Sequence, residues 1–272
     1  MSLEETKRLL RTYRITPNKL LGQNFFVGTG FFDMLSTEAS IIKTDSVLDV
    51  GAGFGFLSHF VADKCKTVIA VEKDPKVAEV LRENLKDVAN VIIIEGDVLK
   101  ISLPPFNKVV AIPPYYLSSR LVTWLLESQI ESAAMILQKE FASRLVAKPK
   151  SEDYGWLAVF AFIHANVEVL DAVPKTMFYP QPEVDSAIVS LKPWSKKPFE
   201  LKDEKSFVKM VKWLFTQRNK KLGKALTPFL RNTLKLSKGE AEKRALDLKF
   251  RDKRVRELNP IDFGDLANDL SS

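Results

Sequence analysis

The feature that most constrains the fold is the segment Val47–Phe56, with the sequence Val-Leu-Asp-Val-Gly-Ala-Gly-Phe-Gly-Phe. Its apolar start is typical of a buried strand, and its glycines are typical of a sharp turn into a helix. A second segment, Ala111–Tyr115, has the sequence Ala-Ile-Pro-Pro-Tyr and predicts a strand end followed by a stiff proline-aromatic loop. Together the two segments indicate a nucleotide-like cofactor held beside a pocket for a flat base.

Strand patterns alternate with helical patterns through most of the chain. The expected strands are Ser46–Val50, Thr67–Glu72, Val91–Glu95, Lys108–Ile112, Ser132–Gln138, Val167–Val173 and Ser186–Lys192. The expected helices between them are residues 31–43, Gly55–Lys64, 75–88, Arg120–Ser128 and Phe141–Ala147. This order predicts an α/β fold with a mostly parallel sheet covered on both faces, and an antiparallel edge formed by the last strands.

The composition shifts near residues 194–199, which we expect to form a linker. Residues 1–193 are predicted to form one domain, in which residues 1–30 are a polar arm that leads into a cofactor loop. Residues 200–272 are predicted to form a small, basic, all-α domain. Its expected helices are Ser206–Thr216, Lys220–Leu230, Lys238–Asp247 and Pro260–Asp269.

The overall composition excludes several classes of protein. The chain has 272 residues, 46% hydrophobic and 28% charged, which is typical of a globular protein. No apolar run reaches the roughly 18 residues of a membrane span, and no apolar signal core is present, so we expect a cytoplasmic protein. The single Cys65 excludes an internal disulfide and a cysteine metal cluster, and two scattered histidines are too few for a histidine site, so no metal is expected. A net charge of +7 favours a polyanionic partner, with nucleic acid preferred over a membrane.

Three glycines and two carboxylates indicate where a cofactor binds. Gly51 and Gly53 allow the backbone to turn sharply and to approach a ligand, and Gly55 starts a helix close to the strand. Glu72 ends the next strand, 21 residues after Gly51, where a carboxylate can accept hydrogen bonds from both hydroxyls of a ribose. Asp97 ends the third strand, where it could accept a hydrogen bond from the amino group of an adenine.

These residues alone leave two cofactor classes open, NAD(P) and S-adenosylmethionine. A dinucleotide fingerprint has the spacing Gly-x-Gly-x-x-Gly, and position 56 is Phe here. The tight Gly-x-Gly-x-Gly spacing, with acidic Asp49 just before it, favours S-adenosylmethionine.

At this point a set of short motifs resembles the KsgA-type ribosomal RNA adenine dimethyltransferases, and most closely their archaeal members. The motifs are Leu21–Phe25, Val47–Gly55, Glu72, Gly96-Asp97, Pro114-Tyr115 with Ser118-Ser119, Gln138–Glu140, Tyr154-Gly155, Phe178–Ser186 and Phe215–Lys220. The resemblance covers essentially the whole length. It implies a Rossmann-like class I S-adenosylmethionine-dependent methyltransferase sheet with a small C-terminal all-α domain.

The resemblance also implies an activity. The cofactor would be S-adenosylmethionine, and N6 of two adjacent adenosines would be dimethylated in a hairpin loop near the 3′ end of small-subunit ribosomal RNA during subunit biogenesis. By resemblance, the cofactor-binding residues are Gln23, Asn24, Phe25, Gly51, Gly53, Gly55, Glu72, Lys73, Asp97, Val98 and Ala111. Glu72 would hold the ribose and Asp97 with Val98 the adenine, while Tyr115 and Phe178 would stack on the target base.

The sequence departs from the family pattern at one catalytic position. The family motif begins with Asn or Asp, whose side-chain oxygen accepts a hydrogen bond from N6, and the aligned residue here is Ile112. An isoleucine side chain cannot accept a hydrogen bond, which leaves the main-chain carbonyl of Pro114 as an acceptor. Two interpretations follow: an enzyme with weakened catalysis, or a catalytically impaired RNA-binding protein of ribosome assembly with the same fold.

Basic residues concentrate toward the C-terminus and predict contacts with RNA phosphates. The expected RNA-binding residues are Arg144, Lys209, Lys212, Arg218, Lys220, Lys221 and Lys224. The expected partner is small-subunit ribosomal RNA or a precursor of the small ribosomal subunit, bound by a monomer. DNA adenine methylation is disfavoured, because the tail and the flanking motifs match the ribosomal family.

Overall fold

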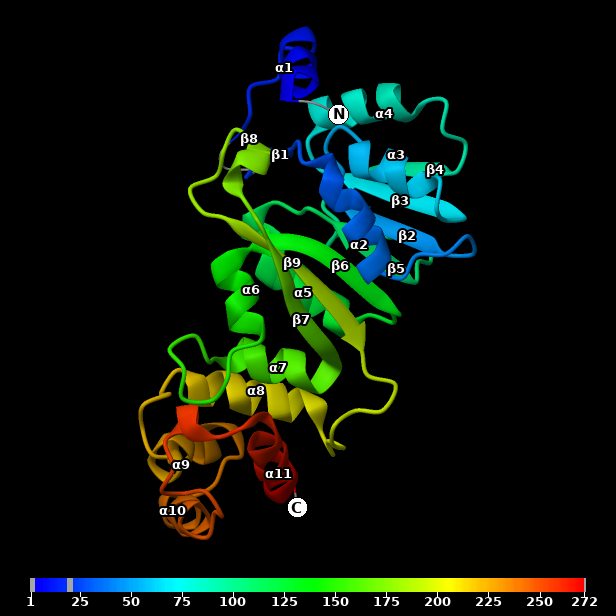
Figure 1. The fold of residues 1–272 in the computed structure, drawn as a ribbon. Coiled ribbons are helices and arrows are strands. Elements are labelled where there is room, and N and C mark those ends of the chain that lie inside the picture. The colour runs from blue at the N-terminus through cyan, green and yellow to red at the C-terminus, as the bar shows by residue number, and fades with distance from the viewer. Residues whose placement is uncertain (1–2, 19–21, 272) are drawn as a thin grey trace. The chain divides into compact units, whose positions relative to one another are not determined.

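The computed structural model describes residues 3–18 and 22–271 (Figure 1). Contacts divide the chain into two compact units. The first unit comprises residues 1–142 and 166–193, and the second comprises residues 143–165 and 194–272.

Seven strands of the described residues form one sheet in the first unit, in the order β4-β3-β2-β5-β6-β9-β7. The strands are β2 (Ser46–Val50), β3 (Thr67–Glu72), β4 (Val91–Glu95), β5 (Lys108–Ala111), β6 (Ser132–Gln138), β7 (Ala165–Val173) and β9 (Ser186–Pro193). The neighbouring strands β4, β3, β2, β5 and β6 all run parallel to one another. Strand β9 pairs antiparallel with β6. The predicted parallel sheet with an antiparallel edge is confirmed.

The central strands are buried without alternation, because helices cover the sheet. Val47, Leu48, Val68, Ile69 and Ala70 are all fully buried, as expected for parallel strands with both faces covered. Besides α1 (Leu3–Thr12), the described helices of this unit are α2 (Phe32–Glu38), α3 (Phe56–Ala62), α4 (Pro75–Leu85), α5 (Ser118–Glu127) and α6 (Lys139–Leu145), the last extending past residue 142. Of these, α4 packs against β3 and β4, α3 against β2 and β3, and α2 against β6.

The strand order reverses beside β2, and this reversal positions the site. Parallel β2 has β3 on one side and β5 on the other, so Val50 lies opposite both Val71 and Ala111. The residues that follow β2 and β5, Gly51 and Ile112, therefore leave the sheet side by side. In open α/β sheets such a reversal opens a crevice at the carboxyl ends of the strands.

The N-terminal segment differs from the predicted polar arm. Residues Leu3–Thr12 form a helix, α1, that buries Leu9 and Leu10 against Phe54, Val77 and Val80. This helix was not predicted, because the many charges of the segment hide the few apolar residues that pack. A two-stranded sheet was also missed: β1 (Phe25–Phe26) pairs antiparallel with β8 (Phe178–Tyr179).

The second unit is helical. Its helices are α7 (Trp156–His164), α8 (Glu204–Phe215), α9 (Leu222–Thr233), α10 (Lys238–Leu246) and α11 (Pro260–Leu270). The sequence-based division at residue 193 differs from the structure, because α7 belongs to this unit. Helix α7 is apolar on all sides, and Val159 and Ile163 share one core with Phe207 and Leu214. Among the described helices, none combines the length and the apolar character that crossing a membrane requires.

Candidate functional site

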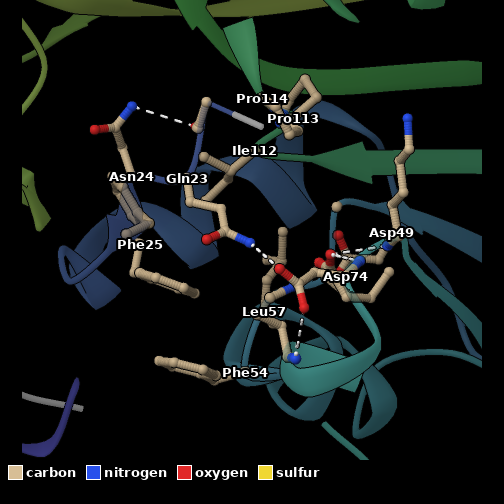
Figure 2. Close-up of a pocket in the computed structure, with 18 of the residues that line it drawn as sticks. Gln23, Asn24, Phe25, Asp49, Phe54, Leu57, Asp74, Ile112, Pro113 and Pro114 are labelled. Atoms are coloured by element: carbon tan, nitrogen blue, oxygen red, sulfur yellow. Dashed lines mark hydrogen bonds between the residues drawn. The ribbon is translucent and has the colours of Figure 1, made fainter. Parts of the chain in front are cut away.

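A pocket opens in the first unit where β2, β3 and β5 end (Figure 2). The predicted site residues that line it are Gln23, Asn24, Phe25, Gly51, Gly53, Glu72, Lys73, Ile112, Pro114, Tyr115 and Phe178. Leu21 of the predicted N-terminal motif lies outside the described residues. The pocket therefore joins the predicted cofactor turn to the predicted catalytic loop.

Four predicted cofactor residues lie outside this lining: Gly55, Asp97, Val98 and Ala111. Gly55 has a φ of +85° and precedes α3, and a Cβ there would lie 2.6 Å from Cδ1 of Leu81, so it sets helix packing. Asp97 pairs with Lys73, at 3.4 Å between Oδ2 and Nζ. Although partial burial opposes it, the N–H of Leu99 and the Lys73 ammonium lower the pKa of Asp97.

The glycine turn packs closely against the proline loop. Gly51 and Gly53 have φ values of +74° and +59°, which side chains other than glycine rarely adopt. The N–H groups of Gly51 and Ala52 both donate to the carbonyl of Val71, at 2.9 and 3.0 Å. A Cβ at Gly51 would lie 2.9 Å from Cδ of Pro114, so the turn and the loop touch without room for a methyl group.

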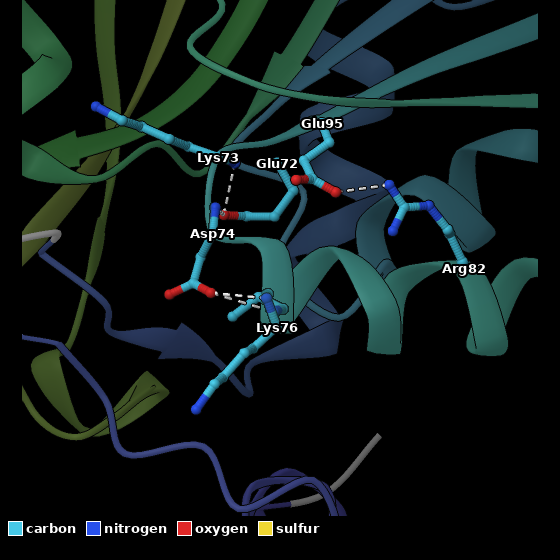
Figure 3. A network of polar contacts seen from close by, with 7 residues as sticks. Glu72, Lys73, Asp74, Lys76, Arg82 and Glu95 are labelled. Atoms are coloured by element: carbon cyan, nitrogen blue, oxygen red, sulfur yellow. Dashed lines mark hydrogen bonds and ion pairs between the residues drawn. The ribbon is translucent and has the colours of Figure 1, made fainter.

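Glu72 organises the backbone around the turn. Its Oε2 accepts a hydrogen bond from the backbone N–H of Gly53 at 3.0 Å. Its Oε1 accepts hydrogen bonds from the backbone N–H groups of Lys73 and Asp74, at 2.8 and 2.9 Å (Figure 3). Burial raises the pKa of Glu72, while these three N–H groups act in the opposite direction. The carboxylate thus both shapes the turn and presents oxygen atoms to the pocket.

Under the hypothesis that Glu72 holds the cofactor ribose, replacing it by glutamine is expected to weaken S-adenosylmethionine binding by about 10²-fold, since a hydrogen bond to a charged group contributes roughly 1.5–3 kcal/mol. The amide –NH₂ of glutamine would face an N–H donor, so the free energy of unfolding should also fall. Calorimetric binding and chemical unfolding measure the two effects, with exposed Glu79→Gln on α4 as the control. Unchanged cofactor affinity, with stability alone reduced, would restrict Glu72 to a structural role.

Asp49 lines the pocket, and the sequence analysis did not include it among the site residues. It is 1% exposed and accepts a hydrogen bond from the Ser58 hydroxyl at 2.6 Å. Burial raises the pKa of Asp49 to about 7, the Ser58 bond lowers it, and nearby Glu72 raises it further. Its position directly before the glycine turn was the available signal. Asp74, Phe54, Phe56 and Leu57 also line the pocket and were not predicted.

The raised pKa of Asp49 predicts a pH-dependent stability. The folded protein holds this proton between the ordinary pKa of 3.8 and about 7, whereas the unfolded chain releases it. The free energy of unfolding should therefore fall as the pH rises through this window, by up to about 1.4 kcal/mol per pH unit. Asp49→Asn, which can still accept from Ser58, should flatten that slope in urea unfolding series, and exposed Asp171→Asn should not. An equal slope in the natural chain and Asp49→Asn would contradict the assignment.

The N-terminal loop is tied to the start of α4. Gln23 Nε2 donates to Asp74 Oδ2 at 2.7 Å, and Gln23 Oε1 accepts from the N–H of Asn18 at 2.7 Å. Asp74 in turn accepts from the N–H groups of Lys76 and Val77 as the N-cap of α4. One wall of the pocket is aromatic, since the rings of Phe25 and Phe54 stack with centroids 4.3 Å apart.

The loop after β5 carries the predicted catalytic residues. Ile112 is partly buried against the apolar cluster that contains Phe32 and Phe178. The Pro114 carbonyl accepts from the N–H of Leu117 at 2.9 Å, within the 3₁₀ turn Tyr115–Leu117. The carbonyl predicted as the remaining acceptor thus has one hydrogen bond within the turn, and its second lone pair can still accept another.

Tyr115 and Phe178, which are predicted to stack on the target base, meet each other at an aromatic corner. Their centroids are 6.1 Å apart at 66°, and the Tyr115 hydroxyl lies 2.7 Å from Oγ of Ser186. Burial raises the pKa of Tyr115. Phe178 is 2% exposed and its edge packs on Phe26, so only a small part of its ring faces the pocket.

The predicted RNA-binding residues all lie in the second unit, and several have partners inside it. Arg218 donates to the carbonyls of Glu152 and Ser151, at 2.8 and 3.0 Å. Lys212 Nζ lies 4.4 Å from the centre of the Trp156 ring. In addition, Lys220 bonds to Gln217, and Lys221 pairs with Asp252. Arg218 in particular holds a loop in place.

With this geometry established, comparison with known proteins identifies the family. The family described as "Ribosomal RNA adenine dimethylase" matches residues 15–257. The chain belongs to the ribosomal RNA adenine dimethylase family. A probable ribosomal RNA small subunit methyltransferase A of Methanosarcina barkeri is 37% identical over 266 residues, which cover 97% of this chain and 91% of the relative. A protein of the same name from Pyrococcus abyssi is 39% identical over 218 residues, which cover 80% of this chain and 78% of that relative.

Two solved structures are similar to the fold of this chain. A dimethyladenosine transferase from Plasmodium falciparum matches with a TM-score of 0.80 at 24% identity, covering 91% of this chain and 96% of that one. The 23S rRNA methyltransferase ErmE matches with a TM-score of 0.68 at 28% identity, covering 92% and 100%. The predicted fold, a Rossmann-like class I methyltransferase sheet with C-terminal helices, is confirmed.

Proposed function

We propose that this dimethylase-family chain transfers methyl groups from S-adenosylmethionine to N6 of two adjacent adenosines. The substrate is a hairpin loop near the 3′ end of small-subunit ribosomal RNA in a maturing subunit. The observation that carries the proposal is the direct contact between the glycine turn at Gly51 and the loop at Pro114, which joins a cofactor site to a base site. The names of the archaeal relatives support the choice of substrate.

The pocket residues fit the cofactor. The turn at Gly51 and Gly53 offers backbone without side chains, and Glu72 offers carboxylate oxygens at the end of β3. We infer that Glu72 holds the ribose, that Gln23 and Asn24 contact the cofactor from the N-terminal loop, and that Asp97 and Val98 hold the adenine beyond Lys73. When bound, S-adenosylmethionine supplies an electrophilic methyl group on its sulfonium.

The base site must orient a weak nucleophile. The lone pair of adenine N6 is delocalised into the ring, and acceptors for the amino hydrogens help the nitrogen to attack. We infer that Tyr115 and the part of the Phe178 ring that faces the pocket contact the target base after it leaves its stack. The Ile112 side chain offers no acceptor, so the remaining acceptor is the second lone pair of the Pro114 carbonyl, which also accepts from the N–H of Leu117. The chemistry here therefore depends mainly on positioning.

The second unit supplies the contacts with RNA. Arg144, Lys209, Lys212, Arg218, Lys220, Lys221 and Lys224 are our candidates for contacts with phosphates, in keeping with the net charge of +7. Arg218 would act in part through the loop that it holds at Ser151 and Glu152.

A second candidate function follows from Ile112. Without a side-chain acceptor for the amino hydrogens of N6, the chain could bind RNA and cofactor and act in subunit assembly while transferring methyl groups very slowly. The two functions differ in a single observable, the methyl groups transferred per bound subunit.

The test uses labelled S-adenosylmethionine and small ribosomal subunits that lack the modification. We expect label in ribosomal RNA from these subunits and none when the same subunits already carry dimethyladenosine. Binding of unmodified subunits with no label incorporated would favour the assembly protein. Absence of both binding and label would contradict both candidate functions.

A further inference from the structure

Tyr116 is a large aromatic residue of the pocket that stays open to solvent. It lines the pocket and is 50% exposed, whereas Phe178 on the same pocket is 2% exposed. Tyr116 follows Tyr115 in a 3₁₀ turn, where successive side chains point a third of a circle apart. Because Tyr115 is held inward by Ser186, Tyr116 lies at the mouth of the pocket.

The ring has a defined position and a cation beside it. A Cβ on Gly22 would lie 3.4 Å from Cδ1 of Tyr116, so the ring rests close to the N-terminal loop. Lys73 Nζ lies 6.0 Å from the ring centre and 3.4 Å from Asp97 Oδ2. Figure 3 shows the Lys73 side chain extending away from Glu72 and Asp74. An aromatic face and an ammonium group therefore share the mouth.

We propose that Tyr116 and Lys73 bind the nucleotide next to the target adenosine, with the Tyr116 ring stacked on its base and the Lys73 ammonium near its phosphate. The proposal rests on the function proposed above. An aromatic ring beside a cation is the combination that binds single-stranded nucleic acid without reading its sequence. A base drawn into the pocket leaves its neighbour without a stacking partner, and Tyr116 replaces that partner.

The two adjacent target adenosines give this site a specific task. When one adenosine occupies the inner pocket at Tyr115, its neighbour is the other target. Tyr116 then holds the second adenosine at the mouth while the first is methylated. Loss of the ring should therefore weaken subunit binding and also lower the share of subunits modified on both adenosines.

The test compares Tyr116→Ala with Tyr116→Phe in the full chain, using unmodified small ribosomal subunits and labelled S-adenosylmethionine. For Tyr116→Ala we expect the KM for subunits to rise roughly 5- to 150-fold, the range that one lost base stack gives. Tyr116→Phe, which keeps the ring, should retain the natural KM. The calorimetric Kd for S-adenosylmethionine should be unchanged in both variants. The Ile112→Asn background provides the same comparison at higher turnover.

Two results would overturn the inference. A raised Kd for S-adenosylmethionine in Tyr116→Ala, with an unchanged KM for subunits, would assign the ring to the adenine of the cofactor. In the second case, Tyr116→Ala would keep the natural Kd for S-adenosylmethionine, the natural KM for subunits and the natural share of subunits modified on both adenosines. Tyr116 would then have no role in binding the substrate. Failure of the proposed function is distinct, because neither the natural chain nor Ile112→Asn would then methylate subunits.

Discussion

Replacing Ile112 by asparagine is expected to raise the rate of methyl transfer by about 10²–10³-fold, the effect of one preorganised polar contact in an active site. Ile112 directly follows Ala111, which lies opposite Val50 in the sheet, so position 112 is fixed beside the glycine turn. The asparagine Oδ1 could accept from the amino group of the target base, which the isoleucine cannot. The gain should appear in kcat measured at saturating cofactor.

The same substitution should lower stability. Ile112 packs against a buried apolar cluster, so a polar amide there loses apolar burial, and the free energy of unfolding should fall by about 1–3 kcal/mol. Faster catalysis in a less stable protein would be the pattern expected of a restored functional residue. Ile112→Val is the matched control, since it stays aliphatic and should keep the natural rate. Equal rates for Ile112→Asn and Ile112→Val would contradict the role assigned to this position.

The second large effect is expected at Gly51. Alanine there would have to adopt a φ of +74° and would place its Cβ 2.9 Å from Cδ of Pro114. The left-handed conformation alone costs about 1–2 kcal/mol, and the contact must in addition displace the proline loop. Gly51→Ala should therefore reduce both S-adenosylmethionine affinity and kcat, because it moves the cofactor turn and the base site together.

Substitutions at two other glycines distinguish the effect of the strained backbone from the effect of the contact with Pro114. Gly53→Ala carries the strain of a φ of +59°, but its Cβ would meet nothing closer than 3.8 Å, so kcat should fall less than in Gly51→Ala. Gly30→Ala meets nothing within 4 Å and should behave as the natural chain does. Calorimetry and single-turnover kinetics give both quantities. Equal losses of kcat at Gly51 and Gly53 would show that the contact with Pro114 is unimportant.

The sheet could be predicted in detail from the sequence. Ser46–Val50, Thr67–Glu72, Val91–Glu95 and Ser132–Gln138 form strands with the predicted bounds. Short aliphatic runs between glycine, proline and charged residues carry this signal, and three of these four strands are almost entirely buried, as expected where both faces of a sheet are covered. The turn with Gly51 and the loop with Pro114 were likewise predicted, since their special backbone conformations demand particular residue types.

The remaining features depend on contacts between distant segments. Helix α1 needs the partners Phe54 and Val77, and helix α7 joins a core made by residues that follow it by 40 positions or more. The pairing of Phe26 with Phe178 rests on two residues per strand, too few for a pattern. The burial of Phe178 and the hydrogen bond from the N–H of Gly53 to Glu72 are likewise products of tertiary packing, which local sequence does not encode.

The most direct test of the account is the position and number of methyl groups on ribosomal RNA after reaction with the natural chain. Unmodified small subunits are incubated with the chain and S-adenosylmethionine, and fragments of the 3′-terminal hairpin are analysed by mass spectrometry. The account predicts N6,N6-dimethyladenosine at two adjacent adenosines of the loop, formed slowly by the natural chain and faster by Ile112→Asn. Methyl groups on other nucleotides, or none from either protein although both bind cofactor and subunits, would contradict it.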